Sequence, residues 1–209
     1  MRWLFVTLLV LSGAAARCEG IVEVLGRSQQ LQLEAFTDAD ADAPSTRKVR
    51  QSFEALRDRA GLGPTVELRV VTGPVLAETL HGRVIIAHQS LGDLDEGARL
   101  FILAHELGHV SLKHWPQMTL LYQAWLPGEL MQAQSDAVAA LLGHDASALA
   151  HRQEFEADVF ALHMLHALGR SAQDAVSAFV QMGVYSDTAT HPGTRKRLAA
   201  LRAAEGELK

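Results

Sequence analysis

Residues 100–112 have the sequence LFILAHELGHVSL, and this stretch decides how the rest of the chain is interpreted. Its side chains are apolar on nearly every side, which predicts a helix buried in the interior. His105 and His109 are four residues apart, so a helix places both imidazoles on one face. Glu106 follows the first histidine and can reach a water molecule held beside them. This H-E-x-x-H pattern predicts a zinc site with its general base, and a metal would compensate polar groups that are costly to bury.

A second motif supplies the third ligand that a catalytic zinc site usually has. Glu154 and Asp158 are four residues apart, so a helix places the two carboxylates side by side. We expect Glu154 to bind the metal and Asp158 to accept the free N–H of a ligating imidazole. An acidic pair of this kind is, taken alone, more often a solvent-exposed helix face. The prediction therefore depends on the pair lying beside the two histidines.

The composition narrows the class of protein. The chain has 209 residues, of which 48% are hydrophobic, which suits one main domain. Its formal net charge of −5 argues against general nucleic-acid binding. The single cysteine, Cys18, excludes an intramolecular disulfide framework and a multi-cysteine zinc finger. A metal site in this chain would therefore be held by histidine and carboxylate.

The N-terminus has the three-part pattern of a secretory signal. Arg2 precedes the apolar residues 3–11, and a run of three alanines ends at Ala16, after which we expect cleavage. The alternatives are a membrane anchor or an N-terminal core strand. We expect a periplasmic protein. Lipidation of Cys18 is the less favoured hypothesis, because Arg17 stands where a lipoprotein signal has a small residue.

The remaining pattern predicts an α+β domain, mostly helical, with a small three-stranded sheet before the histidine-bearing helix. We expect three segments: a signal peptide over 1–16, an N-terminal segment with an acidic loop over 17–44, and one domain over 45–209. Alternation predicts a strand over 66–71 and a hairpin over 75–87 that turns at His81 and Gly82. The expected helices cover residues 46–60, 94–113, 117–125, 128–142, 147–168, 171–182 and 192–204.

Together the two motifs make the chain resemble the HtpX-like zinc metalloendopeptidases, which include the CAAX prenyl proteases and small periplasmic quality-control proteases. The resemblance rests on His105-Glu106-Leu107-Gly108-His109 and Glu154-x-x-Ala157-Asp158, and it covers roughly residues 50–200. The stretch Thr190-His191-Pro192, followed by Arg197-Leu198, is similar to a late segment of the family. Gly193 departs from the family's commoner second proline.

The resemblance implies a zincin-type metalloprotease fold and a role for seven residues. One zinc ion per chain would be bound by His105, His109 and Glu154, with Glu106 as general base. Asp158 and Arg197 would contact the ligand residues. His191 would either close the open zinc position as a latch or stabilise the transition state.

The expected function is metal-assisted hydrolysis of peptide bonds in unfolded or misassembled envelope proteins. The alternative is a zinc-stabilised, chaperone-like or latched binding protein with little proteolysis; a purely structural zinc site would need four closed ligands. The expected partners are polypeptides and not nucleic acid.

Residues 115–142 could cover the metal, touch a membrane surface or simply pack in the core. The oligomeric state is left open. The other histidines receive no role, although His151 could contact the ligand shell.

Overall fold

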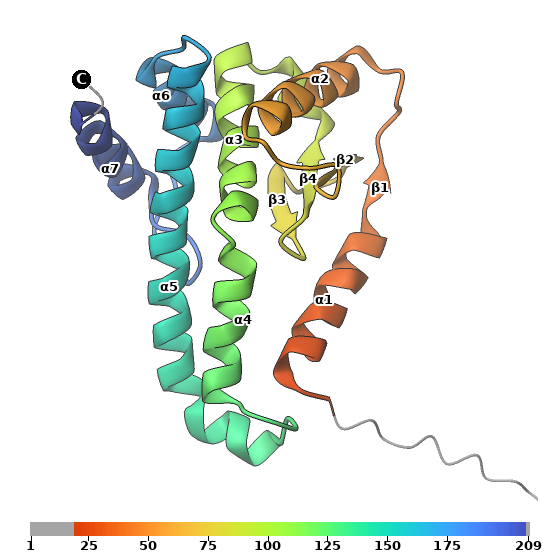
Figure 1. The fold of residues 1–209 in the computed structure, drawn as a ribbon, viewed down its shortest axis with the longest axis vertical. Coiled ribbons are helices and arrows are strands. Elements are labelled where there is room, and N and C mark those ends of the chain that lie inside the picture. The colour runs from red at the N-terminus through yellow and green to blue at the C-terminus, as the bar shows by residue number, and fades with distance from the viewer. Residues whose placement is uncertain (1–18, 208–209) are drawn as a thin grey trace, which may run out of the picture.

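The computed structural model describes residues 19–207 (Figure 1). The predicted signal sequence and Cys18 lie outside the described residues and stay predictions. Within residues 19–207 no helix combines the length and the apolar composition needed to cross a membrane. The described elements are α1 (Ile21–Ala35), β1 (Thr37–Asp38), α2 (Pro44–Arg59), β2 (Glu67–Thr72), β3 (Ala77–Leu80), β4 (Val84–His88), the 3-10 helix η1 (Gln89–Asp93), α3 (Glu96–Ser111), α4 (His114–Trp125), α5 (Gln132–Ala167), α6 (Ala172–Met182) and α7 (Thr194–Glu207).

The predicted α+β class is confirmed, but the sheet has four strands, in the order β1-β2-β4-β3, and not three. The additional strand is β1, within the segment predicted to be an acidic loop, where Thr37 pairs with Thr72 and Asp38 with Val71. A strand of two exposed residues has no alternation to detect in the sequence. Its position depends on tertiary contacts, among them the hydrogen bond of 2.9 Å from Arg69 Nε to Asp38 Oδ1.

The order of the strands leaves β3 at an edge of the sheet. β2 and β4 are parallel, while β3, among the described strands, pairs with β4 alone and runs antiparallel to it. The predicted turn between β3 and β4 is confirmed, because His81 and Gly82 both have positive φ, 53° and 63°. This is the geometry of a type I′ hairpin turn. The tight turn brings β3 back along β4 with its outer edge facing away from the sheet.

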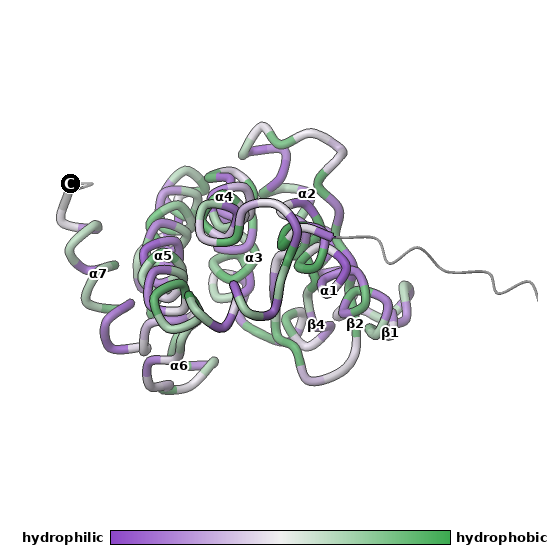
Figure 2. The backbone as a smooth tube through the Cα atoms, turned by 90° about the horizontal axis from the view of Figure 1, so that it is seen from below, coloured by the Kyte–Doolittle hydropathy of each residue, from purple (hydrophilic) through white to green (hydrophobic). Residues whose placement is uncertain are grey.

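Helix α3 is the centre of the fold. Its residues from Gly97 to Gly108 are all buried, and it lies between the sheet and α5 (Figures 1 and 2). The main hydrophobic core combines α2, α3, α5, α6 and one face of the sheet. On the opposite face, Leu33 and Phe36 at the end of α1 pack against strand residues such as Ile86. Helix α1 was absent from the expectation for residues 17–44.

The boundaries predicted for α4 and α5 are wrong, and α5 begins at Gln132 rather than at residue 128. The helices expected over 128–142 and 147–168 are one continuous helix, α5, of 36 residues. Gly143 lies in the predicted gap between them, but a glycine inside an exposed helix costs only about 1 kcal/mol. Helix α4 begins at His114, three residues earlier than predicted. Pro116 suits this first helical turn because the N–H that proline lacks would have no partner there.

Candidate active site

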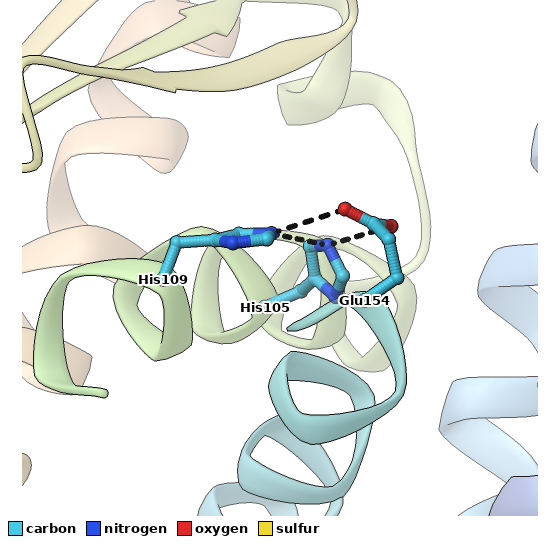
Figure 3. Close-up of side chains that lie close together, drawn as sticks. All are labelled: His105, His109 and Glu154. Carbon is cyan, nitrogen blue, oxygen red and sulfur yellow. Dashed lines mark hydrogen bonds and ion pairs between the residues drawn. The ribbon is translucent and has the colours of Figure 1, made fainter. Parts of the chain in front are cut away.

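Three side chains from two helices converge on one point, as Figure 3 shows. His105 Nε2 and His109 Nε2, both from α3, are 3.1 Å apart. Glu154 from α5 places Oε1 3.3 Å from His109 Nε2 and Oε2 3.5 Å from His105 Nε2. Four ligands arranged tetrahedrally at zinc bond lengths are separated by about 3.3 Å. The two imidazole nitrogens and the Glu154 carboxylate, which faces each of them through a different oxygen, therefore lie close enough together to hold a zinc ion.

The chemistry of this donor set also fits a metal ion. Two imidazoles and one carboxylate form a three-ligand set that leaves a position for water. The Oε2 atom of Glu154 is buried and forms an ion pair with Arg197 Nη1 at 3.1 Å, but it has no hydrogen bond among the described residues. A buried carboxylate is costly to remove from water, so further compensation of its charge is favourable. A cation bound by these three residues would compensate that oxygen.

A close approach of α3 and α5 makes this convergence possible. A Cβ atom added to Gly108 would lie 3.1 Å from the Cα of Ala157, which is closer than most real contacts of that kind. Ala157 is fully buried. The small residues inside the two motifs thus let the helix backbones meet. Glu154 and Asp158, on the same helix as Ala157, consequently reach the imidazole of His105.

Asp158 and Arg197 contact the ligand residues and fix their positions. Asp158 Oδ1 accepts the Nδ1–H of His105 at 3.0 Å. Arg197, from α7, donates to Asp158 through Nε at 2.7 Å and pairs with Glu154 Oε2 through Nη1 at 3.1 Å. Its guanidinium also stacks over the ring of Phe179 at 5.0 Å. One cation therefore fixes two carboxylates, and Arg197 also lines the cleft beside the cluster.

The electrostatics of the cluster favour positive charge among the ligand atoms. Burial disfavours the charged form of His105, but Glu154 and the hydrogen bond to Asp158 outweigh it and raise the pKa of His105 to about 10. Burial also opposes ionisation of Glu154, yet His105, His109 and Arg197 hold the pKa of this carboxyl well below its usual range. Glu154 is therefore an anion facing two imidazoles, which suits a cation site.

Glu106 lies on the cleft side of the same helical turn and is 7% exposed. Its Oε2 accepts a hydrogen bond of 2.7 Å from Thr79 Oγ1, which also lies 3.1 Å from the Glu106 carbonyl oxygen. Thr79 belongs to the edge strand β3, and the sequence patterns gave it no role. The sequence around a threonine in a short strand does not indicate that its side chain faces a glutamate 27 residues later.

The cluster opens into a cleft of about 600 Å³. One wall is the edge strand β3, and a second is the start of α4, with Trp115 and Met118. The third is the connection between α6 and α7, including Tyr185 and His191. Three roles were considered for residues 115–142. The first turns of α4 have the first of these roles, because they cover the metal site. The other part of this segment includes exposed apolar residues, among them Leu120, Met131 and Leu141.

His191 lies near the ligands but is not packed against them. Its Nε2 atom is 3.7 Å from Glu154 Oε1, and its side chain is 60% exposed. Thr190 Oγ1 contacts His191 Nδ1 at 2.8 Å. His151, which the sequence left as an alternative contact of the ligand shell, instead lies 2.8 Å from the carbonyl oxygen of Thr188 through Nε2. It holds the connection that carries His191.

His114 is a second site residue, besides Thr79, that the sequence did not indicate. It was grouped with the histidines that have no role, yet its Nδ1 atom lies 2.8 Å from Nδ1 of His109. The intervening Lys113 has a left-handed backbone, with φ of 58°, and ends α3 so that α4 starts beside His109. Because lysine rarely adopts this conformation, the sequence did not predict the turn. Burial, followed by the neighbouring His109 and His105, lowers the pKa of His114 to about 4.

Comparison with known proteins gave one match. The model of peptidase family M48 matches residues 45–205. No curated protein and no solved structure matches the chain.

Proposed function

This chain belongs to peptidase family M48, the HtpX-like metallopeptidases, and we propose that it is a zinc-dependent endopeptidase that cleaves unfolded or misassembled proteins of the cell envelope. The observation that carries the proposal is the triangle of His105, His109 and Glu154, whose ligand atoms are 3.1 to 3.5 Å apart, with Glu106 on the adjoining turn. We also propose that residues 45–209 form the peptidase domain.

The chain supplies the acid–base chemistry through Glu106. His105, His109 and Glu154 would hold a zinc ion, which would supply an activated water and polarise the scissile carbonyl. Glu106 takes the proton from the attacking water and returns it to the leaving amine. Thr79 holds the Oε2 atom of Glu106 through its hydroxyl, so the other oxygen is the one directed to the water. Asp158 keeps His105 in the tautomer that leaves Nε2 free for the metal.

The edge strand β3 supports binding of an extended substrate. β3 lines the cleft and pairs with β4 on one side alone. A polypeptide can add to such an edge through backbone hydrogen bonds, which gives little dependence on side chains. Folded proteins seldom offer an extended segment of this kind. We therefore propose that the substrates are unfolded chains.

The envelope location rests on residues 1–16, whose pattern predicts export. We propose that the mature protein acts in the periplasm and that Cys18 is not lipidated. The exposed Leu120, Met131 and Leu141 support a peripheral contact with the membrane surface. Mass spectrometry of the mature N-terminus checks the first point, because cleavage after Ala16 without lipid gives a defined mass.

The decisive experiment compares the wild-type protein with Glu106→Gln. The variant keeps the three ligands and the shape of the side chain but loses the base. Zinc content should stay at one ion per chain, while cleavage of casein should fall by about 100-fold or more. Glu54→Gln, on the exposed side of α2, is the matched control and should keep its activity. Undiminished turnover by Glu106→Gln would refute the assignment.

A second candidate function is a latched, chaperone-like protein, and the position of His191 favours it. With Nε2 3.7 Å from Glu154 Oε1, this histidine lies where it could close the open zinc position. A latch predicts that His191→Ala raises casein cleavage, whereas stabilisation of the transition state predicts that it lowers cleavage. A wild-type protein that prevents aggregation of an unfolded client without cutting it would support the second candidate.

A further inference from the structure

His114 is a buried histidine that contacts a ligand residue and has no role in the function proposed above. It is the first residue of α4 and is 3% exposed. Its Nδ1 atom is 2.8 Å from Nδ1 of His109, and the two rings meet edge to face, with centroids 4.9 Å apart and an interplanar angle of 77°. This geometry is directional, because the two nitrogen atoms face each other rather than the carbon edges of the rings.

The direction of the hydrogen bond follows from the other nitrogen of His109. Its Nε2 faces the ligand cluster, 3.1 Å from His105 Nε2. A neutral imidazole that binds a metal through Nε2 carries its proton on Nδ1. His109 Nδ1–H then donates to Nδ1 of His114. His114 must accept through Nδ1, and its own proton consequently lies on Nε2.

The far side of His114 offers an acceptor for that proton. Its Nε2 lies 3.2 Å from Oε2 of Glu156, and the carboxylate of Glu156 is in turn 3.8 Å from Arg152 Nε. The Nε2 atom makes this ion-pair contact with Glu156 but no hydrogen bond among residues 19–207. Gln153 fixes the backbone at the same point by donating to the His114 carbonyl oxygen at 3.1 Å.

We propose that His114 is a positioning residue for the metal site: it holds the imidazole of His109 in the tautomer and orientation that direct Nε2 to the metal, and Glu156 holds His114. The proposal rests on the zinc-dependent function proposed above. It gives the two ligand histidines equivalent supports, since His105 donates to Asp158 and His109 donates to His114. Asp158, Glu156 and Gln153 all lie within residues 152–158 of α5, whereas Arg197, which pairs with Asp158, comes from α7. Supports of this kind usually contribute about 10- to 100-fold to metal affinity.

A histidine that only fills space in the core would affect the site differently. Phenylalanine could replace it with little change in zinc affinity, because the ring volume is retained. A support for His109 instead needs an acceptor atom at the position of Nδ1. His114→Asn places an amide oxygen near that position, while His114→Phe places none there. Comparison of these two variants therefore separates hydrogen bonding from packing.

The test measures zinc affinity by competition with a chromophoric chelator. We expect His114→Phe to bind zinc about 10- to 100-fold more weakly than wild type and His114→Asn to recover most of that loss. Glu156→Ala should weaken binding by about tenfold, and because Glu156 is 43% exposed this variant is expected to fold. At saturating zinc, kcat of all three should stay near the wild-type value. His163→Phe, on the exposed side of α5, is the matched control with unchanged affinity.

The outcomes distinguish this proposal from the function on which it rests. If wild type binds zinc and cleaves casein but folded His114→Phe binds zinc equally tightly, the positioning role alone is refuted. If His114→Phe does not fold, Glu156→Ala decides, and unchanged affinity in that variant overturns the proposal. If wild type itself takes up no zinc, the proposed function and this role fail together.

Discussion

The two halves of α5 differ although they belong to one continuous helix. Residues 132–152 bury two side chains, Leu142 and Leu149, whereas residues 153–167 bury eight, including Glu154 and Asp158. The first half lies beside α4 and the second beside α3 (Figure 1). Leu142 belongs to a small separate cluster with Ile21 and Leu126, far from the central core.

The difference shows that helix formation and site formation have separate causes. Either half can form a helix from local preferences, but the ligand-bearing half also has to pack against α3. Its buried charges are stable only because α3 and α7 bring partners to them. The first half has few buried partners and should tolerate substitution. Three substitutions test this contrast, in addition to those described above.

The largest effect is expected from Arg197→Gln. The variant leaves Glu154 and Asp158 as buried carboxylates without their cation, which should cost about 3–5 kcal/mol in the free energy of unfolding of the zinc-free protein. Urea unfolding after treatment with a chelator measures this loss. Zinc should reduce it, because the metal compensates Glu154. Arg152→Gln, which removes a more exposed pair on the same helix, is the control and should cost less than about 1 kcal/mol. Equal losses of unfolding free energy in Arg197→Gln and Arg152→Gln would contradict the proposed difference between the two halves of α5.

A smaller effect is expected from Gly108→Leu. The new side chain would meet the backbone of Ala157, so α3 and α5 must separate. Overpacking of this kind typically costs about 1–3 kcal/mol, and zinc affinity should fall because Glu154 moves away from the histidines. Thermal unfolding and chelator competition measure the two quantities. The matched change Gly143→Leu, where nothing lies within 4 Å of the added Cβ, should leave zinc affinity unaltered.

The smallest effect is expected from Gly143→Ala. Gly143 lies inside the exposed half of α5, so alanine should raise the free energy of unfolding by up to about 1 kcal/mol. Denaturant unfolding measures the change, and zinc affinity should stay constant. A loss of stability would indicate that the helix is interrupted at this residue, as the sequence pattern suggested.

The predictions that succeeded concern short stretches of chain. The spacing of His105 and His109 fixes both on one face of a helix, and the turn at His81 and Gly82 follows from local backbone preferences. The placement of Glu154 beside the histidines was inferred from chemistry and from the resemblance to a family, and the structure brings it there. The fourth strand was not predicted because it depends on distant contacts, and the start of α4 at His114 because it follows an uncommon backbone conformation at Lys113. The unbroken α5 was not predicted either, although a glycine inside an exposed helix costs only about 1 kcal/mol.

The sequence alone determined which side chains are available for the chemistry and how they are spaced along each helix, because helical periodicity is a local property. The tertiary structure decided which helix faces meet. Only the contact of Gly108 with Ala157 brings Glu154 to His105. Only the left-handed backbone of Lys113 places His114, five residues after His109, against the imidazole of His109. Such contacts join residues far apart in the chain or require an uncommon backbone conformation, and neither leaves a periodic signal in the sequence.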